Sequence, residues 1–487
     1  MSILSHLSPA AVWVYFEEIC KIPRLSKNEE KIRRYLLDFA SANNLKAKED
    51  ETGNILITRE ASPGMEGSKT LVLQSHMDMV GEKNAGHPHN WTTDPIVPQL
   101  KGEWVTASGT TLGADDGIGI ASQMAILTDK DLVAGRIECL FTVDEESGMT
   151  GALNLDPGFF EGRTLINLDS EDEGILFIGC AGGLDTVGTL KAERMETAPG
   201  SQGLAVSVTG LRGGHSGDEI HKGFGNSVKI MNRLLLSLSE KFSIGIDRFD
   251  AGNLRNAIPR EAFATIAVDG DKKNMVTKEI ASLSRMIRDE FGDLEKDLKI
   301  SVEETDTPAT LLNEESRKKL LEILSCCPHG VLAWSKEMED LVETSTNLAS
   351  VKFVDEDLIK IVTTQRSSVE PAKHEAAGMV RACLSLAGAE VLHSDGYPGW
   401  EPSLKSEILR LTRESYVRLF GREPLVRAIH AGLECGLIFR KYPGIDMISF
   451  GPTIRGAHTP EEKIDIKTVA MFWDLLTDVI RSVSSVK

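Results

Sequence analysis

The chain has 487 residues, of which 41% are hydrophobic and 26% are charged, and its glycines and prolines are not gathered into low-complexity tracts. These values are typical of folded globular proteins rather than disordered chains, and the length predicts more than one domain. The 54 Lys and Arg against 73 Asp and Glu give a formal net charge of −19, which disfavours phosphate backbones and anionic membrane surfaces as partners. We therefore expect neither a nucleic acid nor a membrane as a partner.

The N-terminal stretch and the cysteines indicate the cell compartment. The first residues lack a basic region followed by an apolar one and a small-residue cleavage site, and no apolar run approaches the ~20 residues of a membrane span. The seven cysteines form no Cys-x-x-Cys pair, which argues against a disulfide framework and a thiolate zinc site. We expect a soluble protein of the reducing cytoplasm.

The first part of the chain alternates helix-like and strand-like segments. Apolar residues recur at helical spacing in 8–20 and 27–44, and the small and apolar segment 117–128 predicts a buried helix. Runs rich in β-forming residues and bounded by turn residues predict strands at 54–58, 70–73, 137–143 and 164–168. Such alternation indicates an α/β sheet with crossover connections.

From about residue 185 the pattern changes. Strands are predicted at 204–209, 262–268 and 298–303, with helices at about 226–240 and 276–292. A second set in similar order has a helix at 313–325, strands near 349–354 and 358–364, and a helix at 372–387. We interpret 185–397 as an inserted, two-lobed α+β domain.

Alternating elements return after the turn-rich segment 396–400. The predicted elements are helices at 403–419, 432–440 and 466–483 and strands at 425–429 and 445–450. They complete the first sheet. The sequence thus predicts an α/β domain with a mixed sheet flanked by helices, built from 1–184 and 398–487 and interrupted by the insertion.

Side chains capable of metal binding follow the strand at 70–73. His76 and Asp78 are two residues apart, so their side chains point to the same side where the strand ends. An imidazole that binds zinc usually needs a carboxylate or carbonyl on its second nitrogen, and Asp78 suits that orienting role. Taken alone, such a pair is more often a hydrogen-bonded surface pair, so its interpretation depends on the other motifs.

Two acidic motifs supply further candidates. In LGADDG, adjacent aspartates between glycines fit a helix N-cap, but a carboxylate with open approach can also bridge two cations, and Asp115 is the candidate. In VDEESG, consecutive acids after the strand at 137–143 repel one another unless solvent or a cation neutralises them. We assign Glu146 to metal binding and Glu145 to proton transfer.

Asp169 and His458 complete the set. Asp169 directly follows the strand at 164–168, and His458 lies in a Gly- and Pro-bounded loop after the strand at 445–450. Either residue alone is often structural. Because the carboxyl ends of strands meet at one edge of an α/β sheet, where such folds bind ligands, we predict that these residues converge on a metal site.

Two histidines and three carboxylates form a nitrogen and oxygen donor set without sulfur. Such a set suits two divalent ions, with zinc preferred and manganese or cobalt as alternatives. We pair His76 and Asp169 on one ion, Glu146 and His458 on the other, and Asp115 across both. A shared water that ionises near neutral pH would be the nucleophile, and the glutamate before Glu146 would be its general base.

With these motifs the chain resembles the aminoacylase/carboxypeptidase-like di-zinc metallopeptidases. The resemblance spans the chain and rests on an ordered set of segments: SHMDMV, TLGADDGIG, DEESGMTGA, INLDSEDEG, GGHSGDEI, NLRNAIPRE, QRSS, IHAGLECG and GPTIRGAHTPEE. The enlarged insertion is similar to that of the dipeptidase branch rather than to single-lobed aminoacylases, desuccinylases or tripeptidases. The resemblance implies hydrolysis of dipeptides, Xaa-His and carnosine-like ones included.

The resemblance also implies residue roles. The five metal ligands are those given above, with Asp78 as the orienting acid and Glu145 as the general base. The inserted domain is expected to be a lid that mediates homodimer formation, and His215 of GGHSG to polarise the scissile carbonyl. Asn256 and Arg366 are expected to contact the substrate, since a guanidinium can grip a terminal carboxylate with two hydrogen bonds.

Two alternatives remain open at this stage. An N-acyl amino acid deacylase would use the same metal chemistry on a capped amine, and a metal-binding protein without turnover would need only the ligands. The second is disfavoured by Glu145, because a storage site needs no spare base. The sequence has no Gly-x-Ser-x-Gly elbow, no HExxH motif and no glycine-rich phosphate loop, so serine hydrolase, single-zinc and nucleotide chemistry are not supported.

Overall fold

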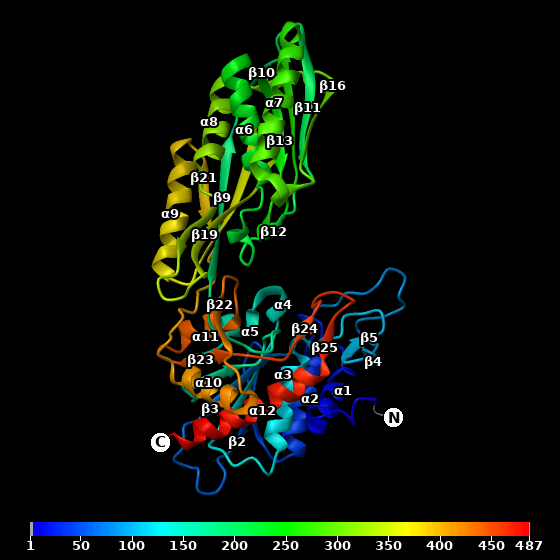
Figure 1. Cartoon of the computed structure of the whole chain (residues 1–487), viewed down its shortest axis with the longest axis vertical. Helices are drawn as coiled ribbons and strands as arrows, with labels where there is room; N and C mark the ends of the chain where they lie inside the picture. The colour runs from blue at the N-terminus through cyan, green and yellow to red at the C-terminus, as the bar shows by residue number, and fades with distance from the viewer. Residues whose placement is uncertain (1–2, 487) are drawn as a thin grey trace. The chain divides into compact units, whose positions relative to one another are not determined.

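The computed structural model describes residues 3–486 and divides into two compact units. Unit 1 runs up to Cys180 and continues through Trp400–Ala428 and from Leu433 onward. Unit 2 comprises Ala181–Gly399 and Ile429–Gly432, and Figure 1 labels many of the helices and strands of both units. The chain therefore enters unit 2 twice.

The second entry into unit 2 was not foreseen from the sequence. The expected insertion, 185–397, lies inside the longer segment Ala181–Gly399, but Ile429–Gly432 also belongs to unit 2. The backbone N–H of Ala181 lies 3.0 Å from the carbonyl oxygen of Ile429 and 3.1 Å from that of Ala431, and it donates to both. Backbone hydrogen bonds hold this second segment in unit 2. Because such bonds do not depend on residue type, the amino-acid composition does not reveal it.

Unit 1 is built around an eight-stranded mixed sheet in the order β1-β2-β6-β3-β7-β23-β8-β22. Its strands are β1 (Lys46–Glu49), β2 (Ile55–Arg59), β3 (Leu71–His76), β6 (Ile137–Thr142), β7 (Thr164–Asn167), β8 (Ile175–Cys180), β22 (Leu425–Ile429) and β23 (Asp446–Ser449). The central strands β6, β3, β7 and β23 run parallel, whereas β1, β2 and β8 add antiparallel pairs. This confirms the predicted mixed sheet.

Helices and a second sheet complete unit 1. The helices are α1 (Ala10–Ile19), α2 (Glu30–Ala42), α3 (Ala114–Thr128), α4 (Glu145–Gly148), α5 (Thr150–Asn154), α10 (Glu407–Phe420), α11 (Glu434–Lys441) and α12 (Ile466–Ser485). The second sheet has the order β24-β25-β5-β4, with β4 (Pro98–Lys101), β5 (Trp104–Ala107), β24 (Ile454–Arg455) and β25 (Lys463–Asp465).

Burial in unit 1 follows the periodicity of the sequence. The helix α1 buries Val12, Trp13, Phe16 and Ile19, which recur at helical spacing along one face. Strands β3 and β6 are buried along their whole lengths, as expected of parallel strands covered on both faces. The loops that follow these two strands therefore start from a fixed, packed edge of the sheet.

Unit 2 contains a nine-stranded antiparallel sheet in the order β16-β11-β15-β13-β19-β20-β9-β21, with β18 paired to β19. Its strands are β9 (Gly182–Lys191), β11 (Ser201–Thr209), β13 (Gly245–Ala251), β15 (Ala262–Asp269), β16 (Lys299–Thr305), β18 (Gly330–Trp334), β19 (Val342–Phe353), β20 (Leu358–Ser367) and β21 (Glu390–His393). The two lobes predicted from the sequence are halves of this one sheet. They join where Ala251 of β13 lies opposite Val351 of β19.

The remaining elements of unit 2 are helices and short strand pairs. The helices are α6 (Ser227–Phe242), α7 (Lys273–Phe291), α8 (Glu314–Cys326) and α9 (Glu370–Leu386), with short 3₁₀ turns at Ile220–Lys222, Gly270–Lys272 and Gly292–Glu295. The short strands are β10 (Arg194–Glu196) paired with β17 (Thr310–Leu312), and β12 (Gly214–His215) paired with β14 (Ala257–Ile258).

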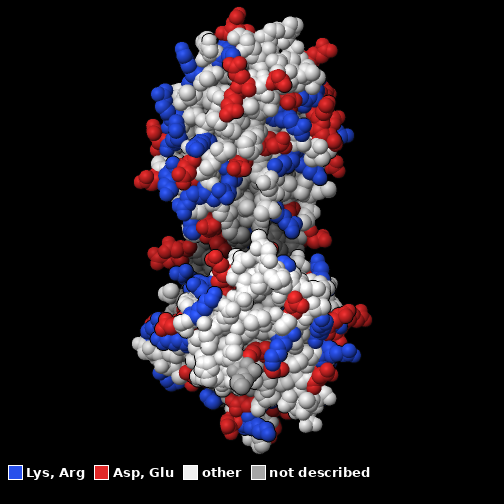
Figure 2. Space-filling view, turned by 90° about the vertical axis from the view of Figure 1, so that its right-hand side faces the viewer, with Lys and Arg blue, Asp and Glu red and all other residues white. Residues whose placement is uncertain are grey.

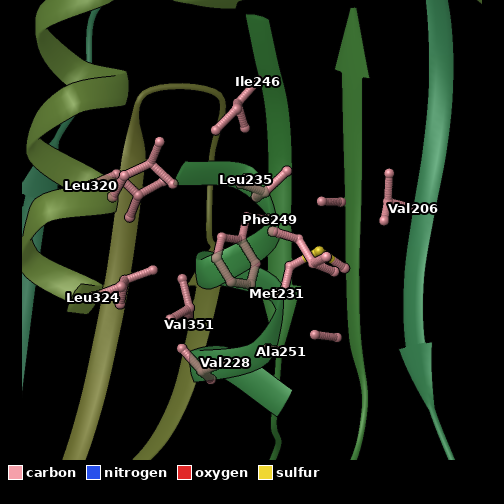
Figure 3. Close-up of a cluster of buried hydrophobic side chains, with 14 of the residues drawn as sticks. Val206, Val228, Met231, Leu235, Ile246, Phe249, Ala251, Leu320, Leu324 and Val351 are labelled. Carbon is pink, nitrogen blue, oxygen red and sulfur yellow. The ribbon is translucent and has the colours of Figure 1, made fainter. Parts of the chain in front are cut away.

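The hydrophobic core of unit 2 lies between this sheet and its helices (Figure 3). Phe249 of β13 is fully buried and lies among Met231 and Leu235 of α6 and Leu320 and Leu324 of α8. The same core includes buried residues of β20, the strand that carries Arg366 at its far end. Apolar burial of this kind, at roughly 25 cal/mol per Å², holds that strand in place.

Several strands of unit 2 were not predicted. Both β9 and β13 contain glycine and aspartate, which are depleted in strands, yet each pairs with a neighbour on both sides. Strand β19 begins at Val342, well before the strand expected near 349–354. In these segments pairing within the sheet overrides local propensity.

The surface carries charges of both signs. Figure 2 shows acidic and basic side chains interspersed over the face in view. Pairs such as Arg410 with Glu414, 2.9 Å apart, and Lys241 with Glu279, 2.6 Å apart, join them. Within residues 3–486, no helix is both long and apolar enough to cross a membrane.

Candidate metal centre

His76 ends β3 and is oriented by Asp78. The Nδ1 atom of His76 lies 3.3 Å from Oδ1 of Asp78, and both side chains are almost fully buried. The same carboxylate accepts hydrogen bonds from the backbone N–H groups of Glu145 and Glu146, at 3.0 and 3.1 Å, and from the Ser26 hydroxyl at 2.8 Å. Asp78 therefore connects the imidazole of His76 to the first turn of α4.

Asp115 lies between two imidazoles at the start of α3. Its Oδ1 is 2.9 Å from Nε2 of His76, and its Oδ2 is 3.2 Å from Nε2 of His458. Its backbone is not helical, and the peptide bond to Asp116 is cis. At the distances given, the carboxylate reaches both histidines at once, as a bridging ligand must.

Glu146 and Asp169 each lie close to one of the two imidazoles. Oε2 of Glu146 is 3.0 Å from Nε2 of His458, and Oδ1 of Asp169 is 3.7 Å from Nε2 of His76. Asp169 follows β7 and Glu146 follows β6, the two parallel strands that flank β3 in the sheet. His458 comes from the loop between β24 and β25 and is about half exposed, with its side chain 51% accessible.

The donor set fits two divalent cations. Ligand atoms of His76, Asp115 and Asp169 all lie within 4.8 Å of one another, and so do those of Asp115, Glu146 and His458. Asp115 belongs to both groups, which is the pairing that the sequence predicts. Imidazole and carboxylate ligands without sulfur suit zinc, with manganese or cobalt as alternatives. Two doubly charged ions would also neutralise acids that otherwise repel one another.

The carboxyl groups differ in their affinity for a proton. Burial raises the pKa of Glu145 well above its usual value; the His76 imidazole opposes the rise and the Asp169 carboxylate adds to it. Burial also acts to raise the pKa of Asp115, but hydrogen bonds from His458 and His76 outweigh it and hold that pKa well below its usual range. The pKa values of the two groups are therefore shifted in opposite directions, which favours the anionic form of Asp115 and the protonated form of Glu145. This division suits a shared ligand beside a proton carrier.

Three further buried charges support the centre. Oε2 of Glu434 accepts from Nε2 of Gln74 at 2.6 Å and from the Thr142 hydroxyl at 2.7 Å, and burial raises the pKa of Glu434 to about 7. Glu462 and Arg24 contact the backbone of the loop that carries Asp115. No role was assigned to Glu462 or Arg24 from the sequence. The position of Glu462 in HTPEE was a signal that could have found it, whereas nothing local marks Arg24.

The other sequence-predicted site residues lie in unit 2. His215 in β12 pairs with Ala257, and the backbone N–H of Ser216 donates to the carbonyl of Asn256 at 2.8 Å. Nδ1 of His215 accepts from the backbone N–H of Asp218 at 3.2 Å and lies 3.4 Å from the Asp218 carboxylate. The structure thus brings His215 and the Asn256 segment together.

Arg366 shares a cavity with Asn256. The cavity, of about 630 Å³, is lined by both residues together with Asp185, Arg255 and Tyr397. Arg366 is 5% exposed, and its Nη1 donates to the Tyr397 hydroxyl at 2.8 Å. This cavity offers a fixed guanidinium and an exposed amide to a small polar ligand.

Comparison with known proteins identifies the family of the chain. The model of peptidase family M20/M25/M40 matches residues 72–482. The chain belongs to this family. The resemblance inferred from the ordered motifs is thereby confirmed.

Individual relatives of the family cover nearly the whole chain. The cytosol non-specific dipeptidase of Escherichia coli K12 is 41% identical over 99% of both chains. The crystal structure of aminoacylhistidine dipeptidase from Vibrio alginolyticus is 41% identical, covers 99% of this chain and 98% of its own, and superposes with a TM-score of 0.92. The aminopeptidase PepT from Bacillus cereus shares the fold at 17% identity and a TM-score of 0.58, over 98% of this chain and all of its own.

Proposed function

We propose that the chain is a dipeptidase that works with two divalent ions, zinc in the first place, held by His76, Asp115, Glu146, Asp169 and His458. The observation that carries the proposal is the shared position of Asp115 in two overlapping groups of ligand atoms. The full-length relatives named dipeptidases support the substrate class.

When bound, the two ions would supply positive charge that polarises the scissile carbonyl and makes an attacking water more acidic. Glu145 takes the proton from that water and passes it to the leaving amine. Its environment supports this role, because burial raises the pKa of Glu145 and so makes its carboxylate a stronger proton acceptor. Asp78 fixes Glu145 through the backbone and fixes the imidazole of His76 through Nδ1.

Unit 2 has the complementary role of recognising the substrate. His215 donates a hydrogen bond to the oxyanion that develops at the carbonyl, and Arg366 pairs with the terminal carboxylate of the dipeptide. Asn256 contacts the same end of the substrate. We also assign unit 2 the role of a lid that joins two copies of the chain as a homodimer, as the family resemblance implies.

We place the enzyme in the cytoplasm. The support is the name of the relative from Escherichia coli, a cytosol dipeptidase, and the absence of paired cysteines among the described residues. Immunoblotting of cell fractions with an antibody against the chain tests the assignment. Recovery in the membrane or exported fraction would contradict it.

The test of the function is hydrolysis by metal-stripped protein with and without added zinc, manganese or cobalt. The panel is Ala-His, Gly-Gly, β-Ala-His, N-acetyl-Ala and Ala-Ala-Ala. We expect metal-dependent cleavage of the dipeptides and none of the other two compounds. Cleavage of N-acetyl-Ala alone would make the chain a deacylase, and two bound metals without any turnover would make it a metal-binding protein.

A further inference from the structure

Glu462 is a buried carboxylate whose hydrogen bonds all go to one loop. Its side chain lies four residues after His458 and is 2% exposed. Its Oε2 accepts from the backbone N–H groups of Leu112 and Gly113, at 2.7 and 2.9 Å. Its Oε1 accepts from those of Ala114 and Asp115, at 2.7 and 3.3 Å. One carboxylate thus binds four consecutive peptide groups, the last of which belongs to the candidate bridging ligand.

Arg24 binds the same loop by donating to one of its backbone carbonyl groups. Its Nη2 donates to the carbonyl of Gly113 at 2.5 Å, and its Nη1 donates to the carbonyls of Asp78 at 2.6 Å and Met77 at 3.0 Å. Arg24 is 2% exposed. Its guanidinium therefore connects the segment after His76 to the loop before Asp115. Arg24 binds the carbonyl group of Gly113, and Glu462 binds the N–H group of the same residue.

The loop is shaped to receive both charges. Gly113 has a φ of 68°, a conformation that favours glycine, and a Cβ atom there would lie 2.7 Å from Nη2 of Arg24. A Cβ on Gly117 would also lie 2.7 Å from that nitrogen. The two glycines that flank the Asp-Asp pair therefore make room for the guanidinium rather than for a metal.

We propose that Glu462 and Arg24 are positioning residues that clamp the loop 112–115 and so fix Asp115 for metal binding. Hydrogen bonds with one ionised partner are about twice as strong as neutral ones, and four of them converge on a single carboxylate. Because a buried charge without partners is costly, the loop and Glu462 hold each other in one arrangement. The inference deepens the proposed function and rests on it, since Asp115 acts there as the shared ligand.

The test compares Glu462→Gln with Glu461→Gln, a matched change in the exposed neighbouring acid. In Glu462→Gln one carboxylate oxygen is replaced by an NH₂ group, which cannot accept hydrogen bonds from the backbone N–H groups that it faces. The loop then loses these hydrogen bonds and its fixed arrangement. We expect the zinc affinity of the metal-stripped protein, measured by competition with a chromophoric chelator, to fall about 10–100-fold, the range seen when support of a ligand is lost. We expect kcat to fall at least about tenfold at saturating zinc with KM changed little. Glu461→Gln should match the wild type in all three quantities.

A second readout does not depend on metal or turnover. In the metal-stripped wild type, the amides of 112–115 should be protected from hydrogen exchange, and Glu462→Gln should exchange them at least about tenfold faster, while Glu461→Gln should not. If Glu462→Gln does not fold by circular dichroism, Arg24→Lys replaces it, because a lysine keeps the charge but cannot span the carbonyls of Gly113 and Asp78.

The outcomes separate the two proposals. Wild-type zinc affinity, kcat and amide protection in a folded Glu462→Gln, or in Arg24→Lys where that variant replaces it, would overturn the clamp while leaving the proposed function intact. Wild-type protein that binds no divalent metal would overturn the proposed function. If Glu462→Gln then still showed faster hydrogen exchange at 112–115, Glu462 would hold the loop without serving a metal site. The proposal that the clamp fixes Asp115 for metal binding would fail as well.

Discussion

The candidate metal centre of unit 1 and the cavity of unit 2 differ in charge and in the way the chain holds them. In unit 1 the functional side chains are mostly acids, and His76, Glu146 and Asp169 lie at or after the carboxyl ends of the parallel strands β3, β6 and β7. In unit 2 the candidates are His215, Asn256 and Arg366, which come from antiparallel strands and the loops between them. Acids gathered at one sheet edge suit cations, whereas a guanidinium and an imidazole suit the negative charge of a substrate or transition state.

The two regions also differ in the number of hydrogen bonds that hold their functional residues in place. In unit 1, Asp78 and Glu462 each accept several hydrogen bonds from the loops that carry the metal-binding candidates. In unit 2, the Arg366 guanidinium donates to the Tyr397 hydroxyl, and Asn256 is exposed. The difference predicts that changes in unit 1 affect metal binding or the chemical step, and that changes in unit 2 affect substrate recognition or oxyanion stabilisation without loss of metal.

The clearest difference in effect is expected between substitutions of the neighbouring residues Glu145 and Glu146. Glu145→Gln should keep both metals and lower kcat by about 10²–10⁴-fold, because the glutamine cannot move a proton. Glu146→Gln should lose metal, since Glu146 is a ligand. Metal analysis together with steady-state kinetics on Ala-His checks both variants. A Glu145→Gln variant that sheds zinc, or that works normally, would contradict the assignment of the general base.

The corresponding change in unit 2 is His215→Ala. We expect a loss of about 10²-fold in kcat, as for other donors to an oxyanion, with the metal content unchanged. His221→Ala, an exposed histidine of the same unit, is the matched control. Near-normal turnover in His215→Ala would remove this imidazole from the mechanism and would leave recognition as the whole role of unit 2.

Arg366→Lys tests the recognition of the carboxylate itself. Lysine keeps the charge but cannot bind a carboxylate with two parallel hydrogen bonds, so KM for Ala-His should rise about tenfold. The control is the substrate: for the dipeptide amide, which has no terminal carboxylate, wild type and variant should have the same kcat/KM. An equal loss on both substrates would show a structural role for Arg366 instead.

The smallest expected effect concerns the stability of unit 2 at low pH. Burial, with a further contribution from Arg366, lowers the pKa of His430 to about 3, whereas it is about 6.5 in an unfolded chain. Below pH 6.5 the unfolded state therefore binds a proton that the folded state does not, so His430 costs stability as the pH falls.

His430→Gln removes this titration. Between pH 7 and 5.5, the free energy of unfolding of the wild type should fall by about 1 kcal/mol relative to the variant. Urea unfolding of both proteins in the presence of a chelator measures the difference. A constant difference across this range would mean that His430 is not buried as a neutral imidazole.

Much of the metal centre was predictable because its residues follow recognisable strands. His76, Glu146 and Asp169 each come directly after a hydrophobic run, and the convergence of such strand ends is a property of the fold rather than of any one residue. The structure brings together all five candidate ligands. Their pairing around Asp115 was proposed from its flanking glycines, but in the structure these glycines make room for the guanidinium of Arg24.

The residues that hold the loop of Asp115 could not be predicted in the same way. Arg24 and Glu462 are separated in sequence by most of the chain, and each acts on backbone atoms, which carry no sequence signal. The same limit applies to β9 and β13, whose glycines and aspartates disfavour strands until pairing on both sides is taken into account. Contacts to the backbone and pairing in a sheet depend on the whole fold.

The most direct test of the central claim is a crystal structure of the zinc-loaded chain, with anomalous scattering measured at the zinc edge. We expect two zinc peaks, one bound by His76 and Asp169 and the other by Glu146 and His458, with one Asp115 oxygen on each. A single peak, or two peaks of which Asp115 contacts only one, would contradict it.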